Sequence, residues 1–363
     1  MWCYFSLFLF FFSLGRATGL KEVHKASSLE IENSRNSTTL GLSPSNLYIN
    51  GIAFGALPAF KEPIEPNEPK DINSKLSKPM AILGDYIKLD TNAEGLRNID
   101  WHLETIQKLP GNPVYQIALM PNHGLKSLSK LVINRIAAKM EEINQKNVTV
   151  WLRFGHEMNG QWYSWGLKPN LFKKKWIHLT LAIRKRAPNT YMMWAPNARF
   201  GKSVNSVKGG YSPYWPGSQY VDIAALSYYH FGGPSRLNIV PAQNEAIEKL
   251  KEFSKLYGYR GKGKPIVLAE TSAPFTRSLF GKVPERGGGS EEEIKISWLS
   301  QLFSGKMHGE VPELKAISWF EVKKNEKAPD GRYRKSEDFR LLLGKEEVSQ
   351  EASSYLAGDW QAD

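Results

Sequence analysis

The run VTVWLRF at residues 148–154, followed directly by Gly155-His156-Glu157-Met158-Asn159-Gly160, decides the predicted fold. Its β-branched and apolar residues are typical of a buried strand, and polar groups gather where the run ends. Similar runs lie on both sides of it, and they end at Phe54, Tyr86, Met120, Trp194, Tyr228, Ala269 and Phe320. The chain therefore offers eight strands, each separated from the next by enough sequence for a helix and its loops.

Helix signals occupy the segments between these runs. Apolar residues recur at helical spacing through 125–144, and Ser290 with Glu293 forms a capping box before another apolar segment. Strands that alternate with helices pair in parallel, so we expect an α/β protein built as a single (β/α)8 TIM barrel. A doubly wound open sheet is the alternative. Its nucleotide-binding forms are disfavoured, because Gly51 and Gly55 do not extend into a dinucleotide fingerprint and Pro265 stands where a P-loop needs Ser or Thr.

The two ends of the chain differ in composition from this barrel. Residues 1–19 open with an uncharged, apolar stretch and are interpreted as a signal peptide, and residues 20–44 as a polar linker, both expected to be disordered. The barrel domain is expected to span residues 45–345. Residues 346–363 are expected to form a C-terminal tail. The protein is therefore expected to be secreted and free of the membrane after signal cleavage, with Asn36 and Asn147 as glycosylation sequons.

Cysteine content and charge limit the function further. The chain has 1 cysteine, Cys3 in the expected signal, so disulfides and thiol chemistry are excluded from the mature protein. The net charge of +12 would be compatible with a polyanionic partner, but the basic residues are scattered along the sequence. Their densest run, 173–175, fits the solvated face of a helix, so no nucleic-acid partner is expected.

Two carboxylates lie where a barrel enzyme carries its chemistry. Glu157 follows the strand ending at Phe154, Glu270 follows the run ending at Ala269, and catalytic groups of such barrels sit at the C-terminal ends of strands. Either glutamate alone fits a salt bridge or a helix cap, but the pair fits the two carboxylates of a glycosidase. A zinc helix is rejected, because H-E-x-x-H would require histidine at Gly160. No metal or cofactor is expected.

Neighbouring aromatic and imidazole side chains suit the same interpretation. His156 fits either a structural histidine or a group that orients the carboxylates. Tryptophans lie at or just beyond strand ends, where they suit either the core or a saccharide cleft, whose aromatic faces pack on sugars. They are Trp162, Trp165, Trp194, Trp215 and Trp319.

Several motifs in order give the sequence a family resemblance over roughly residues 47–325. HEMNG at 156–160 followed by Trp162 resembles glycoside hydrolase family 26, the β-mannanase family of the large (β/α)8 glycosidase clan, and His156 favours this family over clan relatives with Asn there. The remaining motifs are WAPN at 194–197, YWPG at 214–217, YVD at 220–222, Tyr229, and KPIVLAET at 264–271.

The resemblance implies a retaining endo-β-glycosidase that is a monomer and acts on a polysaccharide. It implies that Glu157 is the acid/base and Glu270 the nucleophile. It also implies that Tyr229 hydrogen-bonds the nucleophile, that His156 and Arg153 shape the site, and that Trp162 and Trp319 contact sugars. The family often has Asp where this chain has Ser227. We therefore expect β-1,4-mannan or galactomannan as substrate, with β-1,3-xylan or mixed-linkage β-glucan as alternatives, or a non-catalytic carbohydrate-binding protein on the same scaffold.

Overall fold

The computed structural model describes residues 39–60, 67–232, 237–278, 288–327 and 334–359. The expected signal peptide, most of the polar linker, Cys3 and Asn36 lie outside these residues. The chain divides into two units, Met1–Leu40 and Gly41–Asp363, and every element described below belongs to the second unit.

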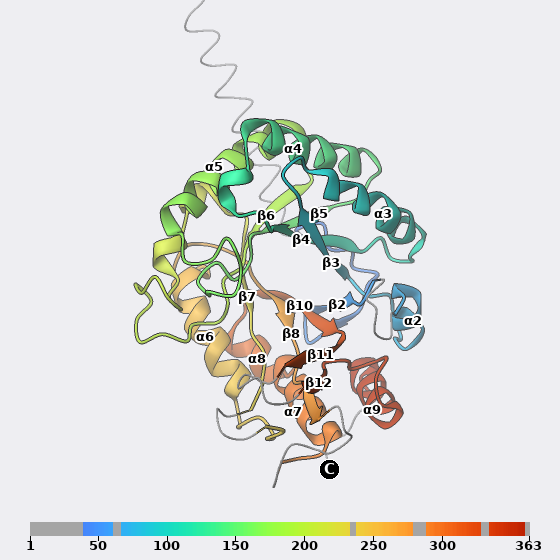
Figure 1. Cartoon of the computed structure of the whole chain (residues 1–363). Helices are drawn as coiled ribbons and strands as arrows, with labels where there is room; N and C mark the ends of the chain where they lie inside the picture. The colour runs from blue at the N-terminus through green and yellow to red at the C-terminus, as the bar shows by residue number, and fades with distance from the viewer. Residues whose placement is uncertain (1–38, 61–66, 233–236, 279–287, 328–333, 360–363) are drawn as a thin grey trace, which may run out of the picture. The chain divides into compact units, whose positions relative to one another are not determined.

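Eight parallel strands form a closed barrel inside this unit (Figure 1). Around the barrel they run β2–β10–β8–β7–β6–β5–β4–β3, and Gly55–Ile82 and Ala56–Leu83 register pairs between β2 and β3 close the ring. This closure confirms the predicted TIM barrel and excludes the open sheet. The strands are β2 Ile52–Pro58, β3 Ile82–Leu89, β4 Val114–Pro121, β5 Val150–Phe154, β6 Thr190–Trp194, β7 Ile223–Ser227, β8 Ile266–Thr271 and β10 Leu314–Glu321.

Helices surround the barrel on its outside, as Figure 1 shows. They cover strands whose residues are buried on both faces, which explains the nearly continuous apolar runs in the sequence. None of the described helices is long and apolar enough to cross a membrane. The helices are α2 Pro69–Ser74, α3 Asn98–Lys108, α4 Lys130–Gln145, α5 Pro169–Arg186, α6 Glu245–Tyr257, α7 Glu291–Leu302, α8 Gly305–Glu310 and α9 Glu346–Ala357, with short 3-10 turns at Glu94–Arg97, Leu125–Ser127, Ser212–Tyr214 and Ser218–Tyr220.

The two helix signals of the sequence have different outcomes in detail. The capping box before α7 is confirmed, since the Ser290 hydroxyl accepts from Glu293 N–H and the Glu293 carboxylate accepts from Ser290 N–H. The segment 125–144 is instead divided into a 3-10 turn and α4, because Ser129 caps the helix by accepting from Val132 N–H.

The first predicted strand, ending at Phe54, is divided by a tight turn. Tyr48–Ile49 forms β1, which pairs antiparallel with the start of β2. Asn50 and Gly51 between them both have positive φ, 48° and 77°, and an Asn-Gly pair is a favoured sequence for such a hairpin turn. β2 therefore begins only at Ile52.

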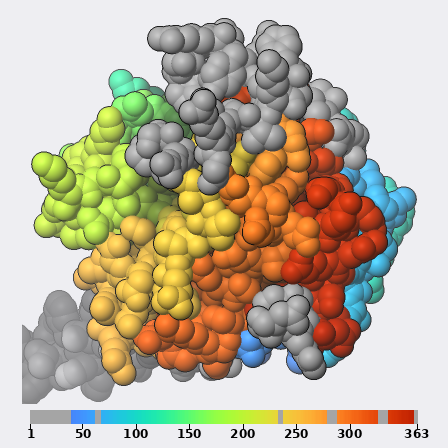
Figure 2. All heavy atoms as spheres, turned by 90° about the horizontal axis from the view of Figure 1, so that it is seen from below, coloured from blue at the N-terminus to red at the C-terminus, as the bar shows by residue number. Residues whose placement is uncertain are grey.

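Residues 346–357 of the expected tail form α9 and pack on the barrel's outer layer. Val348, Ala352 and Leu356 are buried along one face of the helix, and α9 contacts α7. Figure 2 shows the red α9 beside the orange α7 segment on one face of the molecule. The four-residue spacing of these apolar positions is the helix signal that assignment to a tail overlooked.

A small antiparallel sheet extends from the carboxyl ends of two barrel strands. Its order is β11–β12–β9, with β9 Phe275–Ser278 following β8, and β11 Lys323–Lys327 following β10. The central strand, β12, is Arg334–Asp338. The sheet therefore stands at the end of the barrel where Glu157 and Glu270 emerge.

Candidate active site

Glu157 lies just beyond β5 on a sharply turned backbone. Gly155 and Glu157 both have positive φ, 53° and 54°, and Glu157 N–H donates to the Ala195 carbonyl at 2.8 Å. A non-glycine residue in this region carries backbone strain that its surroundings must maintain. The turn keeps the Glu157 side chain, which is 8% exposed, at the barrel mouth.

Glu270 lies on β8, and two donors hold its buried carboxylate. Arg153 from β5 donates to Oε2, and the Tyr229 hydroxyl donates to Oε1. The Tyr229 contact is the one that the family resemblance implied, whereas for Arg153 it implied only a part in shaping the site. Because separate oxygens are bound, the plane of the carboxylate is fixed.

Arg153 and Ser227 join the two glutamates into one network. The Arg153 guanidinium is completely buried, and besides Glu270 it donates to the Ser227 hydroxyl at the end of β7. Ser227 in turn hydrogen-bonds the carboxyl of Glu157. Ser227, noted in the sequence only as a departure from the family pattern, is therefore part of the site.

The two carboxyl groups differ strongly in pKa. Burial raises the pKa of Glu157 to about 7, with a further contribution from the negative charge of Glu270. Burial also acts to raise the pKa of Glu270, but the charge of Arg153 and the Tyr229 hydrogen bond overcome it and lower that pKa to about 2. Between these values Glu157 is protonated while Glu270 is ionised, the division of roles that acid catalysis with a carboxylate partner requires.

His156 is a neutral packing group beneath the site. It is fully buried, with rings of Tyr86, Tyr163 and Trp165 at centroid distances of 5.9, 5.1 and 5.8 Å. Neither ring nitrogen hydrogen-bonds any described residue. Burial, followed by the charge of Arg153, lowers the His156 pKa to about 3, so the ring carries no charge at neutral pH.

Trp162 is at the site and is open to solvent. Its indole Nε1–H donates to Glu157 Oε2 at 2.7 Å, while 49% of the residue is exposed. Gly160 makes this position possible, because a Cβ there would lie 2.3 Å from the Trp162 ring. Trp162 can therefore contact both a substrate and the carboxyl of Glu157.

Three of the other tryptophans that the sequence suggested for a cleft are fully buried, and the fourth packs against the core. Trp165 and Trp194 are in the core, and Trp215 packs edge-on against Trp194 at 4.9 Å. Trp319 is also fully buried, and its indole N–H donates to the Phe339 carbonyl at 2.8 Å. The structure does not bring these four side chains to an open face of the site.

Alternation along β10 explains why Trp319 is displaced from the site. Ser318 faces the barrel interior, where its hydroxyl is 3.4 Å from Gln116 Oε1 on β4. Successive side chains point to opposite faces, so Trp319 faces the helices and Phe320 faces inward. The Phe320 ring lies 6.1 Å from Tyr86 and 6.0 Å from Tyr229. Phe320, rather than Trp319, is the β10 aromatic at the barrel mouth.

Tyr86 and Phe339 lie beside Phe320 and Tyr229 and form an aromatic wall with them at the barrel mouth. The sequence interpretation missed both Tyr86 and Phe339. Tyr86 ends the predicted second strand, so its strand-end position was an available signal, and the Glu270 charge is a cause of its raised pKa, after burial. Phe339, 5.2 Å from Phe320, belongs to a segment with no strand signal. The Glu321 carboxylate holds that segment by accepting from the N–H groups of residues 341–343.

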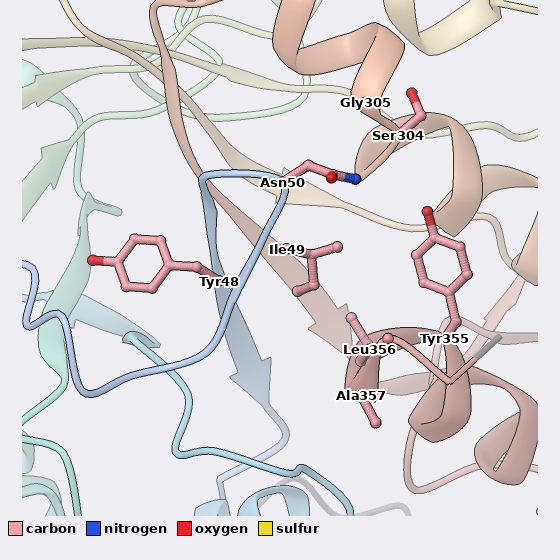
Figure 3. A pocket seen from close by; sticks show the side chains of 9 residues that line it. Tyr48, Ile49, Asn50, Ser304, Gly305, Tyr355, Leu356 and Ala357 are labelled. Carbon is pink, nitrogen blue, oxygen red and sulfur yellow. The ribbon is translucent and has the colours of Figure 1, made fainter.

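A separate pocket of about 530 Å³ lies at the other end of the barrel. In Figure 3, Ile49 faces Tyr355 and Leu356, whereas the Tyr48 side chain points away from them. No charged residue lines it, and the Asn50 amide is engaged with the Phe303 carbonyl at 2.7 Å. Within the described ranges, no group of three His, Cys, Asp or Glu side chains could hold a metal ion.

Parts of the chain are similar in sequence to known proteins. A segment of the chain is 27% identical over 136 residues to "Mannan endo-1,4-beta-mannosidase A and B" of Caldalkalibacillus mannanilyticus, covering 34% of this chain and 24% of that protein. It is 27% identical over 129 residues to a "Mannan endo-1,4-beta-mannosidase" of Bacillus subtilis, covering 32% of this chain and 34% of that protein. The matches thus span about a quarter to a third of these relatives.

Solved structures share the fold at low sequence identity. A modular endo-β-1,4-mannanase from Cellulomonas fimi superposes with a TM-score of 0.53 at 15% identity, covering 86% of this chain and 74% of that one. Fungal β-1,4-galactanases give a TM-score of 0.55 at 11% identity, covering 85% and 94%. The profile of glycosyl hydrolase family 26 matches residues 87–275, which include both glutamates, Arg153 and Tyr229. The chain belongs to glycosyl hydrolase family 26.

Proposed function

We propose that this protein is a retaining endo-hydrolase that cleaves β-1,4-linked mannan or galactomannan, and that it is secreted as a monomer. The observation that supports it best is the buried pair Glu157 and Glu270 at the barrel mouth. Burial and the Glu270 charge raise the pKa of Glu157, whereas Arg153 and the Tyr229 hydrogen bond hold the pKa of Glu270 low. Mannan is the favoured substrate because two partial relatives carry the name mannan endo-1,4-β-mannosidase. The amino-terminal apolar stretch supports secretion.

In the first step Glu157 acts as an acid. With its pKa raised to about 7, it is protonated in weakly acidic solution and donates that proton to the glycosidic oxygen as the bond to the leaving sugar breaks. Ionised Glu270, oriented by Arg153 and Tyr229, attacks the anomeric carbon and forms a glycosyl ester.

The second step follows from the coupling between the two glutamates. Esterification removes the negative charge of Glu270, which is one cause of the raised Glu157 pKa. Glu157, already ionised because it gave its proton to the leaving oxygen, then has a lower pKa and remains a carboxylate. It takes a proton from the water that attacks the anomeric carbon, and the ester bond breaks to release Glu270 as a carboxylate. Two inversions at the anomeric carbon give net retention.

The test is product analysis on defined polysaccharides. Reducing-sugar release from β-1,4-mannan, galactomannan, β-1,3-xylan and mixed-linkage β-glucan should be highest on a mannan. Proton NMR of the earliest products should show the β-anomer. Inverted products would refute the double displacement, and a higher kcat/KM on xylan or glucan would refute the substrate while leaving the mechanism in place. Ser227, where the family often has Asp, is the reason to include those two polysaccharides.

A further inference from the structure

Trp162 and Phe200 form an exposed aromatic pair beside the acid/base glutamate. They come from different loops, after β5 and after β6, yet their ring centroids are 5.8 Å apart with an angle of 37° between the ring planes. Trp162 is 49% and Phe200 48% exposed. Two large apolar rings that adjoin in solvent mark a surface suited to binding an apolar face of a ligand.

Phe200 is held in this position by its own loop. A Cβ on Gly209 would lie 3.1 Å from the Phe200 ring, so the ring packs directly over that glycine, whose φ of 79° also favours glycine. The preceding residue, Arg199, donates its N–H to the Tyr211 hydroxyl at 2.6 Å and forms an ion pair with Glu252 at 2.6 Å.

The loop that carries Phe200 is also fixed to the loop that carries Glu157. Asn159 and Asn197 form two reciprocal hydrogen bonds of 2.9 Å, from the Asn159 amide to the Asn197 carbonyl and from Asn197 N–H to Asn159 Oδ1. Gly209 N–H donates to the Asn159 carbonyl at 2.8 Å. Phe200 is therefore positioned before any substrate arrives, which lowers the entropy lost on binding.

The location of Trp162 identifies the part of the substrate that this pair faces. Trp162 donates to Glu157, the group that protonates the leaving oxygen, so its ring adjoins the leaving sugar. We propose that Phe200 binds the next sugar of the leaving portion, so that the two rings support two consecutive sugars of a β-glycan beyond the cleaved bond. This inference rests on the proposed function. Its chemical basis is contact between the aromatic faces and sugar C–H groups.

The test compares two substrates whose leaving groups differ, one with sugars and one with a single aryl group beyond the cleaved bond. Manno-oligosaccharides place two or more sugars beyond the cleaved bond, whereas an aryl β-mannobioside places a single aryl group there. Phe200→Ala should lower kcat/KM on mannohexaose by about three- to tenfold, the range for loss of one aromatic contact. On the aryl substrate, kcat/KM of Phe200→Ala should stay within about twofold of the wild-type value. On mannohexaose, cleavage should move toward products with shorter leaving portions.

Two matched variants complete the experiment. Phe200→Tyr keeps the ring and should restore mannohexaose cleavage. Tyr259→Ala removes another exposed aromatic residue, which is 55% exposed in the turn after α6. It should leave kcat/KM unchanged on both substrates. Unchanged mannohexaose kinetics in Phe200→Ala, or equal losses on both substrates, would overturn the inference. A wild-type enzyme that prefers another β-glycan would refute the mannan proposal, and the same length comparison on that glycan would then decide the role of Phe200.

Discussion

Replacing Trp162 by Phe should move the alkaline limit of activity upward. The Trp162 indole N–H donates to Glu157 Oε2 at 2.7 Å, and this bond favours the ionised form and so lowers the Glu157 pKa. A hydrogen bond to a charged group contributes about 1.5–3 kcal/mol, and for a half-exposed indole we take about 1 kcal/mol. At about 1.36 kcal/mol per unit, the Glu157 pKa should rise by about 0.5 to 1 unit.

The sign of the expected change follows from the proposed role of Glu157 as the acid. The acid must be protonated, so kcat/KM of the wild type should fall as pH rises through about 7. In Trp162→Phe the same fall should occur about 0.5 to 1 pH unit higher, together with a lower kcat/KM on mannan at its optimum.

The measurement is kcat/KM on a soluble mannan between pH 4 and 10, by reducing-sugar release over roughly half-unit steps. Trp101→Phe is the matched control, because Trp101 is 61% exposed on α3 and should leave the limit unchanged. An alkaline limit of Trp162→Phe that stays in place or moves to lower pH would refute the assigned hydrogen bond or the assignment of Glu157 as the acid.

Three further changes test other parts of the structure. Arg153→Met leaves the Glu270 charge buried without its partner, so the free energy of unfolding in urea should fall by about 3–5 kcal/mol. The acid limit of kcat/KM should move to higher pH. Adding Glu270→Gln to this variant should recover stability. Glu321→Gln removes the anionic acceptor of three backbone N–H groups and should speed amide exchange at residues 341–343, with about 1–3 kcal/mol lost; unchanged exchange would contradict that role. Asn147→Gly keeps the positive φ of 59° and should remove a glycan's mass in a eukaryotic host with kcat/KM within about twofold; unchanged mass would mean an unmodified sequon.

The barrel was predictable because its signal is repeated and local. Strands buried on both faces appear as continuous apolar runs, and their ends mark the face that carries Glu157 and Glu270. Strand-end position alone was enough to locate both glutamates, and the family resemblance supplied Arg153 and Tyr229.

The errors arose where a side-chain direction or a long-range contact decides the outcome. The choice between Trp319 and Phe320 depends on the register of β10, which a run of apolar residues does not reveal. Phe339 reaches the site through contacts with residues distant in sequence: its N–H donates to the Val322 carbonyl, its carbonyl accepts from Ser272 and Trp319, and Glu321 binds the segment that follows. Ser227 takes part through Arg153, a contact between strands that no local pattern encodes.

The positive φ of Glu157 has an evolutionary consequence. Glycine tolerates φ near 54° without the cost of about 1–2 kcal/mol that an L residue with a Cβ incurs. Substitution of this glutamate by glycine would relieve backbone strain and remove a buried carboxyl at the same time. The backbone at this position therefore favours glycine, and a lineage in which the proposed acid is no longer selected would be expected to lose it while keeping the barrel. The glutamate on that turn therefore points to a role for its carboxyl beyond folding.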